Sequence, residues 1–379
     1  MISAGNANPG ADAVAIYADV GAFAHRRITG IARYTARLCL ALARVAQLRF
    51  FHAGEEVVAA DGLDWSHDQD LARWCRRVWC GARRPLRRIS PGAIGLYGTL
   101  RPPHRVFPRE ISVLYDFTPL LTPELHEERT RREFQDYFGR TIALSDAVLA
   151  ISASTKADAL WLAAVDPARV FDVPTGPSLC VERHLDASAT PRRNHVGLVT
   201  ATLEPRKNGP FLLDWFLNSK RIPHNAELWW VGARGWLTSR RTLRALSRGD
   251  GRSRRRVRFL GVVPDQALCR LYRTAAWTAH PSLYEGFCFP VLDSLRHGTP
   301  ALVAHHSSMR EFDMPGVSFF DPRDASTLDD AYAASSLAPR SVATCEQIDA
   351  RFDWRLVARR ILDRFHAASE AASSPSRAA

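Results

Sequence analysis

Short apolar runs alternate with longer amphipathic segments through both halves of this 379-residue chain, and this alternation constrains its fold more than any other feature. The apolar runs have the length of buried strands, and the segments between them have the helical period. We interpret as strands the runs near residues 14–18, 111–114, 147–151, 195–202, 227–231, 257–260, 277–283 and 301–304. Because strands that alternate with helices form parallel sheets covered on both faces, the sequence predicts an α/β protein of two doubly wound, Rossmann-like domains that face a cleft.

A chain of this length can form two domains with separate cores. The polar stretch in residues 174–194 is the best linker candidate on composition, so we place the boundary after Pro177. The predicted domains are residues 1–177 and 178–350. A terminal helix in residues 351–367 is expected to cross back to the first domain, and the Ala- and Ser-rich residues 368–379 to form a disordered tail.

The composition indicates a cytoplasmic globular protein. Hydrophobic residues make up 46% of the chain and charged residues 24%, and no apolar run approaches the ~18 residues that a membrane span needs. Residues 1–10 lack the basic start and the long apolar stretch of a signal peptide. The seven cysteines are scattered without zinc-like spacing, so we expect reduced and mostly buried thiols.

The net charge of +12 raises the question of an anionic partner. Arginine accounts for 48 of the 51 basic residues, because the chain has lysine only at positions 156, 207 and 220. Such a skew is typical of a coding bias rather than of selection at each site. Individual arginines are therefore weak evidence for a binding site, whereas Lys207 is informative.

Two stretches concentrate the positive charge. Residues 73–88 carry seven arginines with Trp74, Trp79 and Leu86 between them, which suits either contact with anionic lipid headgroups or a solvated arginine face. We give these two interpretations equal weight and rank nucleic acid lowest, because no nucleic-acid-binding signature accompanies the charge. The second stretch, residues 240–258, is expected to be a surface helix and loop.

Residues 280–300 carry the most demanding chemistry of the chain. They predict the end of a strand, a loop with Glu285, and a short helix that starts at Pro290 and stops before Gly298. The helix N-terminus would present free N–H groups and the positive end of its dipole to the loop, where they can hold a phosphate. Glu285 and Asp293 frame this position and can accept hydrogen bonds from polyol hydroxyls. A nucleotide-sugar fits that combination.

A pair of adjacent cations stands at the end of the strand in residues 195–202. Arg206 and Lys207 directly precede a helical pattern that begins at Phe211. Two cations at the end of a strand and before a helix N-terminus form a cradle suited to a diphosphate. This is the second strong motif of the chain.

Two further loops are expected to face the same cleft. Thr29 and Gly30 precede a helical pattern in residues 31–45, and glycine lets a ligand approach the backbone closely. Tyr115 and Asp116 follow a buried strand, and the carboxyl ends of such strands line the crevice where open α/β sheets bind ligands.

These motifs resemble those of retaining glycosyltransferases of the GT-B fold, the large family 4 that includes the glycosyl transferases group 1. The phrase Pro-Ser-x-Tyr-Glu-Gly-Phe-x-Phe-Pro-Val-Leu-Asp is similar to the Glu-x7-Glu signature of that family, with Asp293 where the second Glu usually stands. Thr-Leu-Glu-Pro-Arg-Lys-Asn and Thr-Gly-Ile-x-Arg-Tyr are also close to family phrases. The His-Asp segment of the family has Tyr115 in place of the histidine.

The resemblance implies a catalytic and a donor-binding group of residues. The catalytic group is Arg206, Lys207, Glu285, Asp116 and Tyr115. The donor-binding group is Gly30, Asp293, Gly286, Phe287 and Cys288. Arg206 and Lys207 would stabilise the departing diphosphate, Glu285 would hold sugar hydroxyls, and Asp293 would hold the ribose. Tyr115 can position a sugar by hydrogen bonding, but the ordinary pKa of tyrosine makes it a poor base.

The implied reaction is transfer of a hexose or deoxyhexose, with mannose or rhamnose types favoured, from a nucleoside diphosphate sugar to a glycan or lipid-linked glycan. The anomeric configuration would be retained, and protein cations would take the place of a divalent ion, so we expect neither a metal nor another cofactor. The resemblance places the N-terminal domain on the acceptor side and the nucleotide-sugar on the C-terminal domain. The expected setting is bacterial surface polysaccharide or lipopolysaccharide synthesis, in the cytoplasm or at the inner face of the plasma membrane.

Two alternatives stay open on the residues alone. Tyr115 and Asp293 both depart from the family pattern, which favours a non-catalytic scaffold that binds a nucleotide-sugar or a membrane partner. A GT-B enzyme of another class, such as a sugar epimerase or a phosphorylase, would instead release free nucleotide without an acceptor-linked product.

Overall fold

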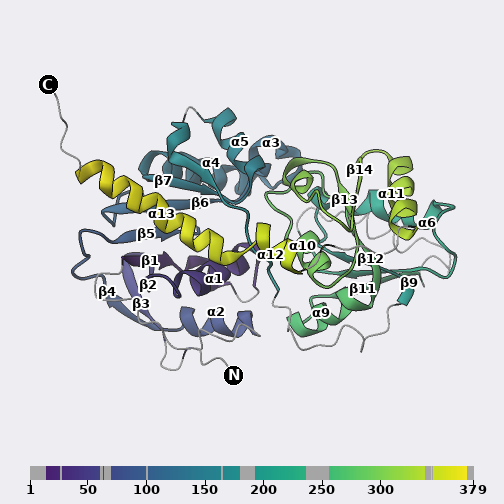
Figure 1. Cartoon of the computed structure of the whole chain (residues 1–379), viewed down its shortest axis with the longest axis horizontal. Coiled ribbons are helices and arrows are strands. Elements are labelled where there is room, and N and C mark those ends of the chain that lie inside the picture. Colours follow the sequence, from purple (N-terminus) through teal and green to yellow (C-terminus); the bar gives the residue numbers. More distant parts are fainter. Residues whose placement is uncertain are drawn as a thin grey trace.

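The computed structural model describes residues 14–25, 28–59, 63, 70–99, 101–163, 165–179, 193–235, 256–337, 343 and 345–373. These residues form two α/β domains that lie side by side, each built on one largely parallel sheet (Figure 1). Most of the basic stretch in residues 240–258 and most of the predicted linker lie outside the described residues.

The first domain contains an eight-stranded sheet, counted over the described residues, in the order β4-β3-β2-β1-β5-β6-β7-β8. Neighbouring strands pair in parallel except at one edge, where β3 is antiparallel to both β2 and β4. The strands are β1 (Ala15–Asp19), β2 (Gln47–His52), β3 (Glu55–Val58), β4 (Ala82–Pro85), β5 (Ile94–Tyr97), β6 (Arg109–Leu114), β7 (Ala147–Ala150) and β8 (Val170–Asp172). The helices are α1 (Gly30–Leu42), α2 (Leu71–Trp79), α3 (Thr118–Leu121), α4 (Glu128–Leu144) and α5 (Ala153–Leu162). Because β1 lies between β2 and β5, the strand order reverses direction between β1 and β5.

The second domain contains a sheet in the order β11-β10-β9-β12-β13-β14, in which every neighbouring pair is parallel. The strands are β9 (Arg193–Thr200), β10 (Glu227–Val231), β11 (Val257–Gly261), β12 (Ala275–His280), β13 (Ala301–Ala304) and β14 (Val317–Phe320). The helices are α6 (Gly209–Asn218), α9 (Asp265–Thr274), α10 (Phe289–Arg296), α11 (Ala325–Leu337), α12 (Cys345–Arg351) and α13 (Trp354–Ser373). Here the order reverses between β9 and β12, which is the point where such sheets bind ligands.

Several helices start where a short polar side chain caps them. The hydroxyl of Thr29 accepts from the Ala32 N–H at 3.1 Å before α1, and that of Ser152 accepts from the Thr155 N–H at 3.0 Å before α5. Each cap satisfies an N–H group that has no partner inside the helix and is worth about 1 kcal/mol. Ser152 therefore marks the start of α5 as Thr29 marks that of α1.

Helix α13 leaves the second domain and lies across the first (Figure 1). The Trp354 ring packs edge-on against Tyr34 of α1, with ring centroids 5.1 Å apart, and its Nε1 donates to the Pro177 carbonyl at 2.8 Å. The helix continues to Ser373, so residues 368–373, which we expected in the disordered tail, are helical. This corrects the predicted helix end at residue 367. Alanine, abundant in these residues, has the highest helix propensity of all residues.

We expect the backbone contact at Gly232 to be sensitive to any side chain. A Cβ at Gly232 would lie 1.9 Å from the carbonyl oxygen of Ala201, so the loops after β9 and β10 would have to separate. Gly232→Ala should lower the free energy of unfolding by more than about 2 kcal/mol in urea titrations. Gly261→Ala is the matched control: its φ is 68° but no atom lies within 4 Å of the added Cβ, and we expect a loss of only about 1 kcal/mol. Equal losses in the two variants would contradict this interpretation.

Candidate active site

Two loops meet at the switch point of the second sheet. The 3-10 helix η4 (Pro205–Lys207) follows β9, and the loop in residues 281–288 follows β12. Strand β12 ends at His280 rather than near residue 283, because Pro281 has no N–H for the ladder. The Leu283 N–H, which we expected to lie in the strand, donates to the Arg206 carbonyl at 2.9 Å and joins the two loops.

Four charged side chains form one cluster in these loops. Arg206 donates to Glu285 Oε2 at 2.7 Å and to Glu204 Oε1 at 2.7 Å, and Lys207 Nζ donates to Glu285 Oε1 at 2.5 Å. None of the four side chains is more than 17% exposed. The structure therefore brings together Arg206, Lys207 and Glu285, the central residues of both sequence motifs.

The charges of the cluster determine its protonation. Burial acts to raise the pKa of Glu285, but the charges of Lys207 and Arg206 outweigh it and bring this pKa to about 2. Burial likewise acts to lower the pKa of Arg206, and the charges of Glu285 and Glu204 outweigh it, so this pKa is raised. At neutral pH, Glu285 is thus an ionised and weakly basic carboxylate.

Three serines hold the loop that carries Glu285. Ser282 donates to Glu285 Oε1 at 2.6 Å, the Glu285 N–H donates to Ser307 Oγ at 3.0 Å, and Ser308 donates to the Glu285 carbonyl at 2.8 Å. Neither these serines nor Glu204 was identified from the sequence. The available signal was position, because Ser282 and Glu204 lie inside the two motifs; the two serines of η5 (Ser307–Glu311) meet the loop only through the fold.

The residues directly after the Glu285 loop are buried. Phe287 packs against Phe289 and Phe312, with ring centroids 5.4 and 5.2 Å apart. Cys288 is the N-cap of α10 with φ of 73°, and burial raises the pKa of its thiol to about 12. Any donor contact by Phe287 or Cys288 would therefore come from the backbone at the start of α10, which begins one residue before Pro290.

Asp293 binds the segment that connects the two domains. Its carboxylate accepts from the N–H groups of Ser178 and Leu179, both at 3.0 Å, and from the Ser178 hydroxyl at 2.5 Å. The side chain is buried, and burial raises its pKa against the effect of these hydrogen bonds. A carboxylate has about four lone-pair positions, so the three donors leave about one for the ribose contact predicted from the sequence.

Gly286 and Tyr115 form a contact between the domains. A Cβ at Gly286 would lie 1.9 Å from the Tyr115 carbonyl oxygen, which also accepts from the Thr155 hydroxyl at 3.2 Å. The Tyr115 hydroxyl lies 3.4 Å from Thr35 Oγ1, and burial raises its pKa well above the ordinary value. Tyr115 is therefore a neutral phenol at physiological pH, which leaves it a positioning role and not that of a base.

Asp116 lies near the charged cluster, together with a histidine that the sequence did not indicate. Asp116 Oδ1 accepts from the Thr118 N–H at 3.0 Å and from its hydroxyl at 2.6 Å, and the Asp116 charge acts on both Arg206 and His126. Burial, followed by the charge of Arg206, lowers the pKa of His126. The cleft thus holds a neutral imidazole although the family histidine is replaced by Tyr115.

The start of α1 borders the same cleft from the first domain. Gly30 is the first residue of the helix and is exposed, and no atom of the described residues lies within 4 Å of the position where its Cβ would stand. One turn on, Arg33 forms an ion pair with Asp265 of α9 in the second domain. The first turn of α1 is therefore open to a ligand, as expected for Gly30.

The basic stretch in residues 73–88 lies on α2, β4 and the following loop. Trp74 is only 4% exposed and packs against Phe23 and Phe50, so it belongs to the core and is unavailable for membrane contact. In the part of the chain that the structure describes, no helix is long and apolar enough to cross a membrane. Within the same residues, no group of three or more His, Cys, Asp and Glu side chains could hold a metal ion.

Comparison with known proteins gives two sequence similarities. A family model described as Glycosyl transferases group 1 matches residues 193–334, which include the charged cluster. O-antigen chain mannosyltransferase B of Escherichia coli is 24% identical over 376 residues, covering 86% of this chain and 93% of the relative.

Solved structures share the whole architecture. Sucrose-phosphate synthase of Thermosynechococcus elongatus has a TM-score of 0.64 at 14% identity and covers 94% of this chain and 100% of that chain. HepE of Anabaena in complex with UDP-glucose has a TM-score of 0.61 at 15% identity, with coverages of 94% and 100%. WaaG, a glycosyltransferase involved in lipopolysaccharide biosynthesis, has a TM-score of 0.57 at 14% identity, with coverages of 96% and 100%.

Two buried histidines predict how stability depends on pH. Burial lowers the pKa of His280 to about 3 and that of His297 to about 4. The unfolded chain binds these protons near pH 6.5 and the folded chain does not, so their stabilising contribution is complete above pH 6.5 and is lost as the pH falls. Each histidine should lower the free energy of unfolding by about 1 kcal/mol between pH 6.5 and 5.5, as measured by urea unfolding.

His297→Gln should therefore show a smaller loss of stability over this interval than the wild type. His305→Gln, at an exposed position, is the matched control and should keep the wild-type pH dependence. An unchanged pH dependence in His297→Gln would show that His297 is not buried in its neutral form.

Proposed function

We propose that this chain transfers a hexose or deoxyhexose from a nucleoside diphosphate sugar to a glycan or lipid-linked glycan. The chain has the GT-B fold, and residues 193–334 match the model of the glycosyl transferases group 1. The observation that carries this proposal is the contact of Arg206 and Lys207 with Glu285 at the switch point of the second sheet. The mannosyltransferase relative supports a mannose- or rhamnose-type sugar and a place in surface polysaccharide synthesis. The HepE complex supports a nucleotide-sugar donor.

The charged cluster would act on the leaving group. The main barrier is cleavage of the glycosidic C–O bond while negative charge grows on the diphosphate. Arg206 and Lys207 would exchange part of their bonding to Glu285 for diphosphate oxygens, and the N-terminus of α10 would add its dipole. Preorganised donors of this kind stabilise a transition state by about 3–4 kcal/mol.

Retention of configuration is what the family resemblance implies, and the weak basicity of Glu285 favours a route to it without a covalent intermediate. A carboxylate with a pKa of about 2 is a poor nucleophile and a poor base, so it would hold sugar hydroxyls rather than form a covalent intermediate. The acceptor oxygen would bond to the anomeric carbon on the face that the diphosphate leaves. The acceptor proton would pass to a diphosphate oxygen. Because two protein cations bind the leaving group, the reaction would not require a divalent ion.

The first domain would meet the acceptor at the inner face of the plasma membrane. Arg84, Arg87 and Arg88 are exposed on β4 and the loop after it, and Arg73 and Arg76 are exposed on α2. This arginine face suits anionic headgroups without insertion of Trp74.

A non-catalytic scaffold is the second candidate. It is favoured by Asp293, whose carboxylate already binds Ser178 and Leu179. Donor binding without turnover on any acceptor would support the scaffold, and release of nucleotide without an acceptor-linked product would support an epimerase.

Removing the Lys207 charge should slow transfer by about 100- to 1,000-fold, because one donor to the developing diphosphate charge is lost. A panel of GDP-, UDP-, ADP- and dTDP-sugars first identifies the donor by the rise in melting temperature that it causes. Turnover with that donor is then compared between wild type and Lys207→Ala, in EDTA and with added Mg²⁺.

Lys220→Ala is the matched control, because Lys220 is an exposed lysine outside the cluster. It should keep the wild-type rate. A near-normal rate in Lys207→Ala would remove this residue from the mechanism, and loss of wild-type activity in EDTA would refute the metal-independent reaction.

Membrane contact should depend on the exposed arginines of β4 and its loop. Replacing Arg84, Arg87 and Arg88 by Gln should weaken binding to phosphatidylglycerol vesicles by about 1 kcal/mol for each charge, as measured by vesicle sedimentation. The control replaces Arg129 and Arg132, which are exposed on α4 and paired with glutamates. Equal binding by both variants and the wild type would dismiss this surface.

A further inference from the structure

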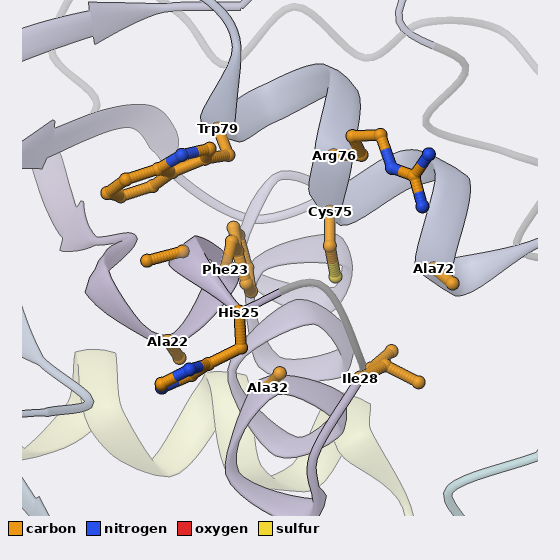
Figure 2. A pocket seen from close by; sticks show the side chains of 10 residues that line it. Ala22, Phe23, His25, Ile28, Ala32, Ala72, Cys75, Arg76 and Trp79 are labelled. Carbon is orange, nitrogen blue, oxygen red and sulfur yellow. The ribbon is translucent and has the colours of Figure 1, made fainter.

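A cavity of about 340 Å³ opens in the first domain between the 3-10 helix η1 (Gly21–Ala24), the start of α1 and helix α2. Figure 2 shows the Trp79 indole at one end of this cavity and His25 at the other, with Phe23 and Cys75 between them. Ligand pockets span about 300–1,000 Å³, so this cavity suits one sugar residue better than a nucleotide. The charged cluster in the second domain does not contribute to it.

The cavity adjoins one side of the position where a sheet of this kind binds ligands. η1 directly follows β1, and β1 and β5 flank the switch point of the first sheet. Ile28 and Ala32 of the cavity wall stand on either side of Gly30 in the chain, and Arg33 of the same helix reaches Asp265 in the second domain. The cavity therefore lies beside the interdomain cleft, on its first-domain side.

The wall combines aromatic faces with positive charge. Phe23 and Trp79 provide rings of the kind that pack against the C–H face of a sugar. Arg76 and His25 supply hydrogen-bond donors, and none of the described residues that line the cavity is a carboxylate. Burial raises the pKa of the Cys75 thiol to about 12, so it is neutral and unreactive. A wall with donors and no acidic group selects an anion.

The indole of Trp79 is held in place from outside the cavity. The Arg83 guanidinium lies 4.6 Å from the ring centroid and donates to the Trp79 carbonyl at 3.3 Å. The His52 ring packs edge-on, 5.2 Å away, and His52 Nδ1 lies 2.9 Å from Asp19 Oδ1. Asp19 is 3% exposed and also accepts from the Thr99 hydroxyl at 2.5 Å. The Trp79 ring is therefore held in its orientation before any ligand binds.

We propose that this cavity binds a sugar ring that carries a phosphate, with the ring against Trp79 and Phe23 and the phosphate on Arg76. The proposal that the cavity is a binding site depends only on the geometry of the first domain. Its role as the acceptor subsite rests on the proposed function and would make the acceptor a phosphorylated or lipid-diphosphate-linked sugar.

The test is calorimetric titration of the full chain, without nucleotide-sugar, with the 1-phosphates of mannose, glucose, rhamnose and N-acetylglucosamine. At least one should bind at least tenfold more tightly than both its methyl glycoside and inorganic phosphate. Arg76→Gln should weaken that binding at least tenfold, and Trp79→Leu likewise. Arg44→Gln, an exposed arginine just after α1 and outside the wall, is the matched control and should bind as the wild type does.

Unchanged binding in Arg76→Gln, or no binding of any sugar phosphate to the wild type, would overturn the proposal. Arg76 is exposed, so its variant tests the site even where Trp79→Leu fails to fold. If a farnesyl-diphosphate-linked sugar binds more tightly than the sugar 1-phosphate, the acceptor is lipid-linked. If the two bind equally, the acceptor is a free phosphorylated sugar. Both results support the site. Donor binding is read separately, from the rise in melting temperature that the nucleotide-sugar causes, which separates failure of the cavity from failure of the donor site.

Discussion

The pairing of Arg206 and Lys207 with Glu285 is the interaction on which the candidate site depends. A charge that is largely withdrawn from water costs several kcal/mol unless an opposite charge meets it, and here two cations stand beside each other at no more than 17% exposure. Glu285 and Glu204 make this possible, since each accepts from Arg206. The bond from the Leu283 N–H to the Arg206 carbonyl holds the two loops in the register that the pairing needs.

Contacts beside this cluster hold the two domains close together. Gly286, next to Glu285, touches the Tyr115 carbonyl across the cleft. Nearby, the carboxylate of Glu311 accepts from the Ala153 and Ser154 N–H groups at 3.3 and 2.9 Å, where the N-terminus of α5 favours a negative charge. These contacts place the first domain against the loop that carries Glu285. The proposed donor site lies at the switch point of its sheet, and the proposed sugar-phosphate cavity adjoins the segment that follows β1 in the first sheet.

Much of the fold was predictable because its signals are local. Apolar runs separated by helical periods indicated the parallel sheets. Neighbours distant in sequence decided what the local patterns left open. Membrane contact was one of two open interpretations of the basic stretch around Trp74, and the structure buries this tryptophan against Phe23 and Phe50. The sequence indicated Asp293 as a group that binds ribose. In the structure its carboxylate accepts hydrogen bonds from the Ser178 and Leu179 N–H groups.

The sequence by itself determined the two-domain α/β architecture and the choice of Arg206, Lys207 and Glu285 as candidate site residues. Strand and helix periods, glycine and proline positions and adjacent charges are all properties of short segments. The tertiary structure decided which groups these residues meet. The serines at positions 307 and 308, and His126, come near the cluster only through strand order and the docking of the domains. The same is true of the cavity at Trp79, whose wall joins η1, α1 and α2. Such contacts depend on packing between residues far apart in the chain, which no local pattern encodes.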